Sequence, residues 1–368
     1  MSVASPIDTT DEILVSGDGH VCEPVDLWET RLPERFRDRG PHFPNIKYGQ
    51  ANHARVGGRD PVERLKDMAI DSMSAEVLYP TLGNHVYRLG DTELIEACTS
   101  AYNDWMAEYC SAAPDRLWGQ AMIPLFNMDY AVGELERTRK DGLAGATIWL
   151  APPDDLPFHT PHYERFWAAA QELEMPVSMH INAGFGHYAT RTSLTPRTRQ
   201  HQSVNLNKFA AMTSLTDIIC SGVLDRYPRL KIVLAEIQVG WIPFWLNEAD
   251  DWNQTQPNEE LEGLPISAYF WRQVYATFID DRVGTYLAQE WGQNNFLWSS
   301  DYPHVNSIWP TSRDVIKKSM GYLPAETRRN FVTLNTARVY NRPIPAPIGP
   351  PDQEVGRGEW SRRSQFER

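Results

Sequence analysis

Eight short apolar runs alternate with helix-like segments along most of the chain, and this alternation restricts the possible folds more than any other feature. Each run is almost continuously apolar, as expected of strands that are buried on both faces of a parallel sheet. The runs span residues 13–21, 75–81, 117–124, 145–151, 176–182, 230–237, 273–279 and 296–301. Eight repeats of strand and helix predict an α/β protein with a closed (β/α)8 TIM barrel rather than an open sheet.

The segments between the runs carry helical patterns. The clearest spans 92–112, where apolar residues recur at intervals of three and four. Further helices are predicted at 129–140, 162–173, 208–224, 242–251 and 282–291. No glycine-rich phosphate loop follows the first apolar run, which disfavours a dinucleotide-binding fold.

The pattern predicts one structural domain with two insertions and two terminal extensions. We expect an N-terminal tail (1–12), a barrel domain (13–341) and a proline-rich, charged C-terminal arm (342–368) that is disordered or wraps onto a neighbouring subunit. The insertions are residues 29–59 after the first strand and 183–206 after the fifth. A homodimer is the expected assembly.

Composition restricts the class of protein. The net charge of −13 argues against nucleic acid or an anionic membrane as a partner of the whole surface. The four cysteines show no paired spacing and read as reduced thiols. No signal peptide is evident, and no apolar stretch reaches the roughly 18 residues needed to span a bilayer. We therefore expect a cytoplasmic enzyme.

Metal-type side chains end four of the apolar runs. Asp18 and His20 lie two positions apart and so point to the same face of a strand. In a TIM barrel the carboxyl ends of all strands meet at one mouth, where active sites lie. This convergence predicts a metal centre whose ligands are Asp18, His20, His180, Glu236, Asp301 and His304.

Each of these residues also has a structural interpretation. His180 could be a hydrogen-bonded core residue, and Asp301 could cap the following helix. A buried carboxylate such as Glu236 costs several kcal/mol unless a metal or another cation, for example an arginine, lies beside it. His304 could bind metal, transfer protons or hold Asp301 in place. We expect Asp301, Glu236 and His304 to be the catalytic groups.

The insertion at 183–206 contains basic residues but neither aspartate nor glutamate. If it overhangs the barrel mouth, its field would attract a small anionic substrate. We expect His187, Arg191 and Arg197 to contact that substrate. The alternative is a solvated surface loop.

Several motifs together resemble the amidohydrolase-related (amidohydrolase 2) family. They are Asp-Gly-His-Val-Cys-Glu-Pro at 18–24, His180, Leu-Lys-Ile-Val-Leu-Ala-Glu-Ile-Gln-Val-Gly-Trp-Ile-Pro at 230–243 and Ser-Asp-Tyr-Pro-His at 300–304. The resemblance implies a TIM barrel that holds a divalent metal at Asp18, His20, His180 and Asp301. Members of the family include hydrolases and non-oxidative decarboxylases of the aminocarboxymuconate-semialdehyde and resorcylate type.

The chain departs from the decarboxylase pattern in its sixth strand. Those enzymes usually carry a catalytic histidine where this sequence has Glu236, and no strand-end lysine is present to form the carbamate bridge of dinuclear amidohydrolases. The sequence also resembles a branch of non-haem diiron monooxygenases that act on terpenoid acyl intermediates. Three histidines and three carboxylates suit two iron or manganese ions.

Two enzymatic interpretations therefore remain, and the branch resemblance favours the first. The first is a diiron monooxygenase that uses O2 to hydroxylate a bulky apolar carboxylate or acyl-CoA. The alternative is a hydrolase or non-oxidative decarboxylase that uses one zinc or manganese ion on a small carboxylated substrate. A barrel that only binds ligands is a third possibility, which the complete set of ligand-type residues disfavours.

Overall fold

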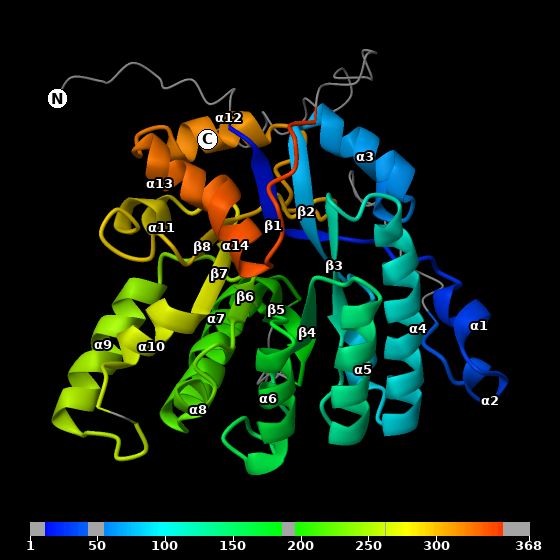
Figure 1. Cartoon of the computed structure of the whole chain (residues 1–368), viewed down its shortest axis with the longest axis horizontal. Helices are drawn as coiled ribbons and strands as arrows, with labels where there is room; N and C mark the ends of the chain where they lie inside the picture. The colour runs from blue at the N-terminus through cyan, green and yellow to red at the C-terminus, as the bar shows by residue number, and fades with distance from the viewer. Residues whose placement is uncertain (1–11, 43–54, 186–195, 262, 349–368) are drawn as a thin grey trace.

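Eight parallel strands form a single sheet in the order β1 to β8, and their carboxyl ends define one mouth (Figure 1). The structure is a computed structural model that describes residues 12–42, 55–185, 196–261 and 263–348. The strands are β1 (Leu14–His20), β2 (Met73–Tyr79), β3 (Leu117–Met122), β4 (Gly145–Ala151), β5 (Val177–Gly184), β6 (Ile232–Ala235), β7 (Val274–Phe278) and β8 (Phe296–Trp298). All eight predicted strands and the barrel class are confirmed.

Helices surround the strands in the outer layer (Figure 1). The longer ones are α3 (Pro61–Ile70), α4 (Thr92–Ser111), α5 (Met128–Lys140), α6 (Glu164–Glu172), α7 (Pro196–Cys220), α9 (Ile242–Thr255), α10 (Ile266–Gln273) and α12 (Ser312–Met320). The shorter α-helices are α1 (Leu27–Arg31), α2 (Glu34–Arg37), α8 (Val223–Arg226), α11 (Arg282–Leu287), α13 (Ala325–Arg329) and α14 (Asn335–Val339). Short 3-10 helices lie at Val56–Gly58, Gly83–Arg88 and Pro161–Tyr163, and a π-helical segment lies at Asn330–Leu334.

All six predicted helices are present, but several ends differ: α9 runs on to Thr255, α11 stops at Leu287, and the largest difference is at the start of α7. Helix α7 begins at Pro196, inside the segment predicted as an insertion, because proline suits the first turn and no glycine or further proline interrupts the chain up to Cys220. Other boundaries follow local signals. Asp60 caps α3 by accepting hydrogen bonds from the amides of Val62 and Glu63, with Pro61 in the first turn.

The barrel interior is closed at its amino end by the last helix. Ala337, Val339 and Tyr340 pack against interior residues near the strand starts, including Val15 and Val233. The Tyr340 hydroxyl lies 2.9 Å from the hydroxyl of Tyr79 inside the barrel. With this end filled by side chains, the opposite mouth remains as the place for chemistry.

The seam between β1 and β8 closes at the predicted metal centre. The Asp301 amide donates to the Asp18 carbonyl at 3.0 Å, and the His20 amide donates to the Tyr302 carbonyl at 2.7 Å. Arg64 of α3 lies beneath this seam and donates from Nη1 to the His20 carbonyl at 2.7 Å. Its Nε pairs with Oε2 of Glu76 on β2 at 2.6 Å, and both side chains are almost completely buried. The seam therefore fixes the segments that carry the predicted ligands.

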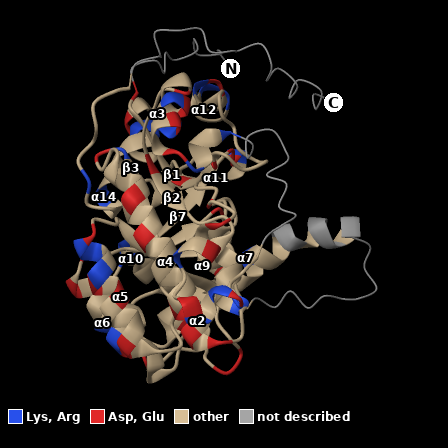
Figure 2. Cartoon of the chain, turned by 90° about the vertical axis from the view of Figure 1, so that its right-hand side faces the viewer, with Lys and Arg blue, Asp and Glu red and all other residues tan. Residues whose placement is uncertain are grey.

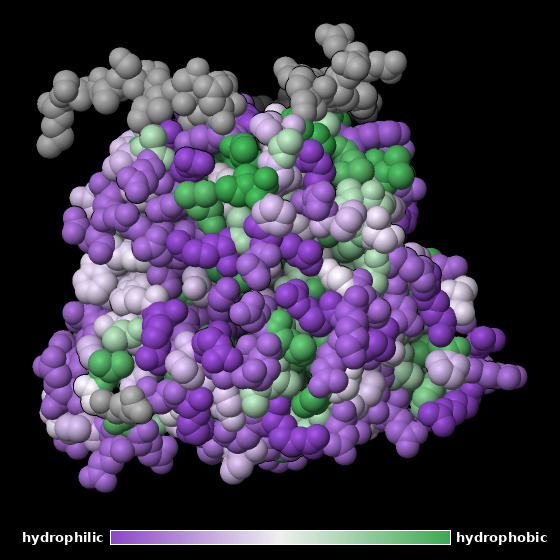
Figure 3. All heavy atoms as spheres, viewed as in Figure 1, coloured by the Kyte–Doolittle hydropathy of each residue, from purple (hydrophilic) through white to green (hydrophobic). Residues whose placement is uncertain are grey.

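Charged residues of both signs lie on the outer helices, and the face seen in Figure 3 is mostly hydrophilic. In Figure 2, acidic and basic residues are interspersed along the outer helices, including α2, α5 and α6. Figure 3 shows a largely hydrophilic face on which apolar residues form separate patches. Within the part of the chain that the structure describes, no helix combines the length and apolar character required to cross a bilayer.

Candidate metal centre

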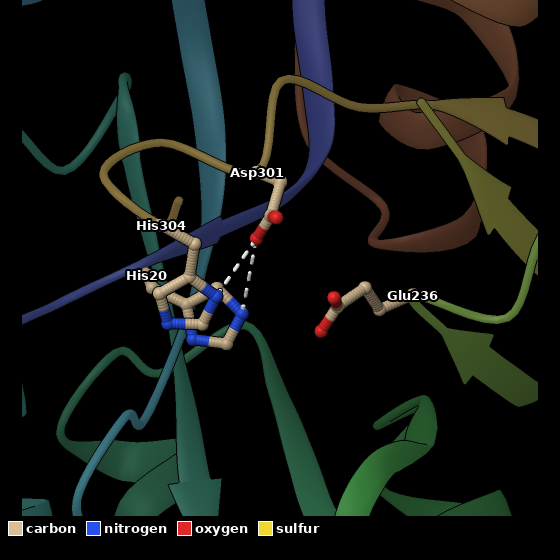
Figure 4. A group of neighbouring side chains, drawn as sticks. All are labelled: His20, Glu236, Asp301 and His304. Atoms are coloured by element: carbon tan, nitrogen blue, oxygen red, sulfur yellow. Dashed lines mark ion pairs between the residues drawn. The ribbon is translucent and has the colours of Figure 1, made fainter. Parts of the chain in front are cut away.

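The six predicted metal ligands lie together at the carboxyl end of the barrel. Their donor atoms form two groups, each with all its atoms within 4.8 Å of one another, and His20 belongs to both. One group is Asp18, His20 and His180, and the other is His20, Glu236, Asp301 and His304. Figure 4 shows the second group. Asp301 lies above the two imidazoles, and Glu236 reaches toward them from the right of the view. The predicted convergence is confirmed, whereas the role of each residue as a ligand remains a prediction.

Hydrogen bonds orient the imidazoles of His20 and His180 toward a common point. His20 Nδ1 lies 3.1 Å from the carbonyl of Pro80, and His180 Nδ1 lies 2.7 Å from the carbonyl of Ile181. Because a carbonyl only accepts, each Nδ1 is the protonated nitrogen, and each Nε2 is left as a ligand atom. The two Nε2 atoms are 3.1 Å apart. This is about the separation of neighbouring donors that each bind one metal at roughly 2.1 Å.

Asp18 supplies a carboxylate oxygen to the same point. Its Oδ1 is buried, accepts no hydrogen bond within the described chain, and lies 3.5 Å from His20 Nε2 and 3.8 Å from His180 Nε2. Its other oxygen, Oδ2, accepts from the Thr277 hydroxyl at 3.2 Å. Two imidazole nitrogens that face a buried carboxylate are stabilised by positive charge between them, which a proton or a metal can supply, and the donor set fits a divalent metal.

Asp301 and His304 form the opposite wall of the site. Asp301 Oδ1 lies 3.0 Å from His304 Nδ1 and 3.7 Å from His20 Nε2, as the dashed lines in Figure 4 mark. The rings of His20 and His304 stack with centroids 3.6 Å apart. Asp301 therefore faces two imidazoles and the space beside them.

Glu236 follows directly after β6 and is the most distinctive residue of the site. Its Oε2 lies 3.7 Å from His180 Nε2, and its amide donates to the Thr277 hydroxyl at 2.7 Å. Both Glu236 (φ 59°) and Asp301 (φ 53°) adopt left-handed backbone conformations, which are unfavourable for residues with a side chain and concentrate at functional sites. The sequence analysis considered an arginine as the partner of Glu236. Among the described residues, Glu236 instead forms its ion pair with His180.

The electrostatics of the site favour positive charge between the carboxylates. Burial, followed by the charge of Asp301, raises the pKa of Glu236 to about 8. Burial by itself lowers the pKa of His180, but the Asp18 carboxylate and then Glu236 raise it to about 9. Burial lowers the pKa of His304 to about 4, so that imidazole is neutral at pH 7. A cation bound among these groups would relieve the repulsion between the acids.

The side chains of the predicted substrate-binding residues lie outside the part of the chain that the structure describes. His187 and Arg191 lie outside the described residues. The backbone of Arg197 belongs to the first turn of α7, but its side chain lies outside the described part of the chain. Their contact with a substrate stays a prediction.

Sequence reasoning missed the residues that hold the ligands in place, namely Arg64, Glu76, Thr81 and Thr277. Two of them are threonines within or directly after strands, and that position alone gives no chemical signal. The carbonyl of Pro80 is a backbone group, so no residue type could reveal it. Arg64 carried a weak signal, because a charged residue on the apolar face of a helix needs a buried partner.

The comparisons with known proteins agree with this architecture. A family model for amidohydrolases (Amidohydro_2) matches residues 42–342. Gamma-resorcylate decarboxylase of Rhizobium sp. (strain MTP-10005) is 24% identical over 299 residues, which cover 75% of this chain and 86% of that protein.

Two solved structures have the same fold. An amidohydrolase of Mycobacterium avium subsp. paratuberculosis K-10 superposes with a TM-score of 0.76 at 19% identity, covering 90% of this chain and 100% of that one. A 5-carboxyvanillate decarboxylase of Novosphingobium aromaticivorans, solved with manganese and 4-hydroxy-3-methoxy-5-nitrobenzoic acid, gives 0.69 at 17% identity, covering 90% and 97%. The match over most of the barrel shows that the chain belongs to the amidohydrolase family.

Proposed function

We propose that this chain is a metal-dependent, non-oxidative decarboxylase of a small aromatic carboxylate. The observation that carries the proposal is the convergence of two imidazole Nε2 atoms, 3.1 Å apart, on the buried carboxylate of Asp18. The names of the relatives support the choice of reaction, since gamma-resorcylate and 5-carboxyvanillate decarboxylases are among them. The alternative of the sequence analysis thus replaces the monooxygenase that the branch resemblance favoured.

The proposed metal ligands are Asp18, His20, His180 and Asp301. Manganese is the first candidate because it is bound in the carboxyvanillate decarboxylase structure, and zinc is the second. A bound divalent ion would supply a Lewis acid that polarises an oxygen of the substrate. The same positive charge would attract the substrate carboxylate into the barrel mouth, and His187, Arg191 and Arg197 remain the proposed contacts of that anion.

Glu236 is proposed to deliver the proton. Loss of CO2 breaks the bond between the carboxylate carbon and the ring, and the electron pair left on the ring carbon must take up a proton. Glu236 faces the two imidazoles (Figure 4), and burial raises the pKa of its carboxyl group, which favours the protonated form that a general acid needs. Asp301, which lies beside the His304 imidazole, would accept a hydrogen bond from the substrate's hydroxyl.

An anaerobic decarboxylation assay tests the proposal. Metal-depleted protein reloaded with Mn2+ or Zn2+ would be incubated with hydroxybenzoates that carry a carboxylate beside a hydroxyl, and CO2 and the phenol would be quantified. We expect equimolar CO2 and phenol without O2, and at least 100-fold less of both for Glu236→Gln, in line with the ~10²–10⁴-fold contribution of a general acid. Glu259→Gln, on the exposed segment after α9, is the matched control and should keep full activity. Absence of CO2 across the panel with a fully loaded site would refute the proposal.

A second candidate function rests on the second ligand group. Glu236, Asp301 and His304 add a further set of donors to Asp18, His20 and His180, and six donors exceed what one ion with an open coordination position requires. Two iron ions and an O2-dependent hydroxylation of a bulky acyl substrate would use the whole set. Two equivalents of iron per chain, together with substrate-dependent O2 consumption, would favour this candidate over the decarboxylase.

A further inference from the structure

The loop after β2 contacts two of the site's histidines without contributing a charged side chain. The Pro80 carbonyl accepts from His20 Nδ1, and the Thr81 hydroxyl lies 3.1 Å from Nε2 of His304. Glu23 anchors this loop because its buried carboxylate accepts from the amides of Thr81 (3.0 Å), Leu82 (2.9 Å) and Gly83 (2.9 Å). Three hydrogen bonds to one carboxylate hold the loop rigidly beside the site.

The hydroxyl of Thr81 has a single proton, and that proton is already used. Its Oγ1 donates to the Val21 carbonyl at 2.6 Å, in the segment that directly follows His20. A hydroxyl that donates elsewhere can only accept from a third group. The contact between Thr81 and His304 therefore requires the proton to be on Nε2 of the imidazole.

We propose that Thr81 is a positioning residue that selects the Nε2–H tautomer of His304 and so directs the unprotonated Nδ1 into the metal centre. In this tautomer Nδ1 faces Asp301 Oδ1 at 3.0 Å, and both are acceptors that a cation can bind together. The stacking of His304 on His20 holds the plane of the ring, while Thr81 sets which nitrogen carries the proton. The proposal rests on the proposed metal centre and extends it to His304.

The opposite tautomer has an identifiable cost. A proton on Nδ1 would bond to Asp301, but Nε2 would then face the oxygen of Thr81 as a second acceptor. Thr81 would have to turn its proton away from the Val21 carbonyl, which would lose a 2.6 Å hydrogen bond. A buried carbonyl without a donor costs about 1–3 kcal/mol. With a cation bound between Nδ1 and Asp301, the hydrogen bond from Thr81 to Val21 therefore favours the Nε2–H form.

Nitrogen NMR of the full chain tests the tautomer directly. Protein labelled with 15N-histidine would be studied metal-free and loaded with Zn2+, with the His304 signals assigned from a His304→Gln spectrum. We expect the Nε2–H pattern for His304 in the Zn2+-loaded wild type, with the metal-free spectrum as the reference. A Zn2+-loaded wild-type spectrum with the proton on Nδ1 and an unprotonated Nε2 would overturn the proposal. Because this readout needs no decarboxylation, it can fail while the proposed reaction stands, and the reverse also holds.

Zinc affinity provides the second readout. Thr81→Val keeps the shape of the side chain but removes the acceptor, and we expect it to lower Zn2+ affinity about 10–100-fold, the usual effect of losing such a partner. Thr81→Ser restores the hydroxyl and should return the affinity to within about threefold of the wild type. Thr138→Val, which removes a buried hydroxyl bonded only within α5, is the control and should leave affinity unchanged. Wild-type affinity in Thr81→Val, or no recovery in Thr81→Ser, would contradict the proposal.

Discussion

Replacement of Arg64 by methionine would break the buried ion pair beneath the barrel seam. Arg64 is fully buried, and its partner Glu76 is 3% exposed. Removing one member of a buried pair leaves an uncompensated charge, which costs about 3–5 kcal/mol. The variant also loses the hydrogen bond to the His20 carbonyl, worth about 0.5–1.5 kcal/mol, while the methionine recovers some apolar packing. We expect a net loss of about 4 kcal/mol in the free energy of unfolding.

Urea unfolding followed by tryptophan fluorescence would measure this loss. In the double variant with Glu76→Gln, no buried charge is left alone, so we expect at least half of the lost stability to return. Arg31→Met is the matched control, because Arg31 pairs with Glu108 on the surface and such pairs contribute about 0–1 kcal/mol. If Arg64→Met destabilises the protein no more than Arg31→Met, the reasoning about the seam is wrong.

Two further predictions concern pH and the last residue of β5. Burial raises the pKa of Asp71 from 3.8 to about 7, against the opposing hydrogen bonds from Ser312, so the folded state holds a proton that the unfolded state releases. This contribution to stability is present below pH 4 and is lost as pH rises to about 7, so Asp71→Asn should gain on the order of 4 kcal/mol relative to the wild type between pH 4 and pH 8. A pH-independent difference between the two unfolding free energies would contradict it. Gly184 has a φ of 95°, and a Cβ there would lie 2.4 Å from the Ala151 carbonyl. Gly184→Ala should therefore lower the unfolding free energy by about 2 kcal/mol or more, and an unchanged melting temperature would count against this.

The sequence was sufficient to predict the barrel because its signals are local and repeated. Continuous apolar runs indicate strands buried on both faces, and their regular alternation with amphipathic helices leaves few architectures. The same logic located Asp18, His20 and His180, since a polar residue at the end of an apolar strand has to lie at the barrel mouth. The N-terminal turns of α7 were not predicted as helix, because they lack the apolar periodicity that marks a packed helix.

The groups that orient the ligands could not be predicted, because they depend on distances between segments that are far apart in the chain. Thr277 joins Asp18 to Glu236 with one hydroxyl, and this role follows only from the pairing of β7 with its neighbours. The choice of reaction was also beyond the sequence. Glu236 is chemically compatible with proton delivery to a ring carbon and with ligation of a second ion, and the residue type alone does not separate these functions.

Metal content per chain tests the central claim most directly. Protein expressed with added manganese and zinc, purified without chelators and analysed by inductively coupled plasma mass spectrometry, should contain one equivalent of a divalent ion. Substitution of either nitrogen ligand, His20→Ala or His180→Ala, should reduce this to below one tenth of an equivalent while the circular dichroism spectrum stays unchanged. Folded variants that keep the full wild-type metal content would contradict a cation held between these imidazoles and Asp18.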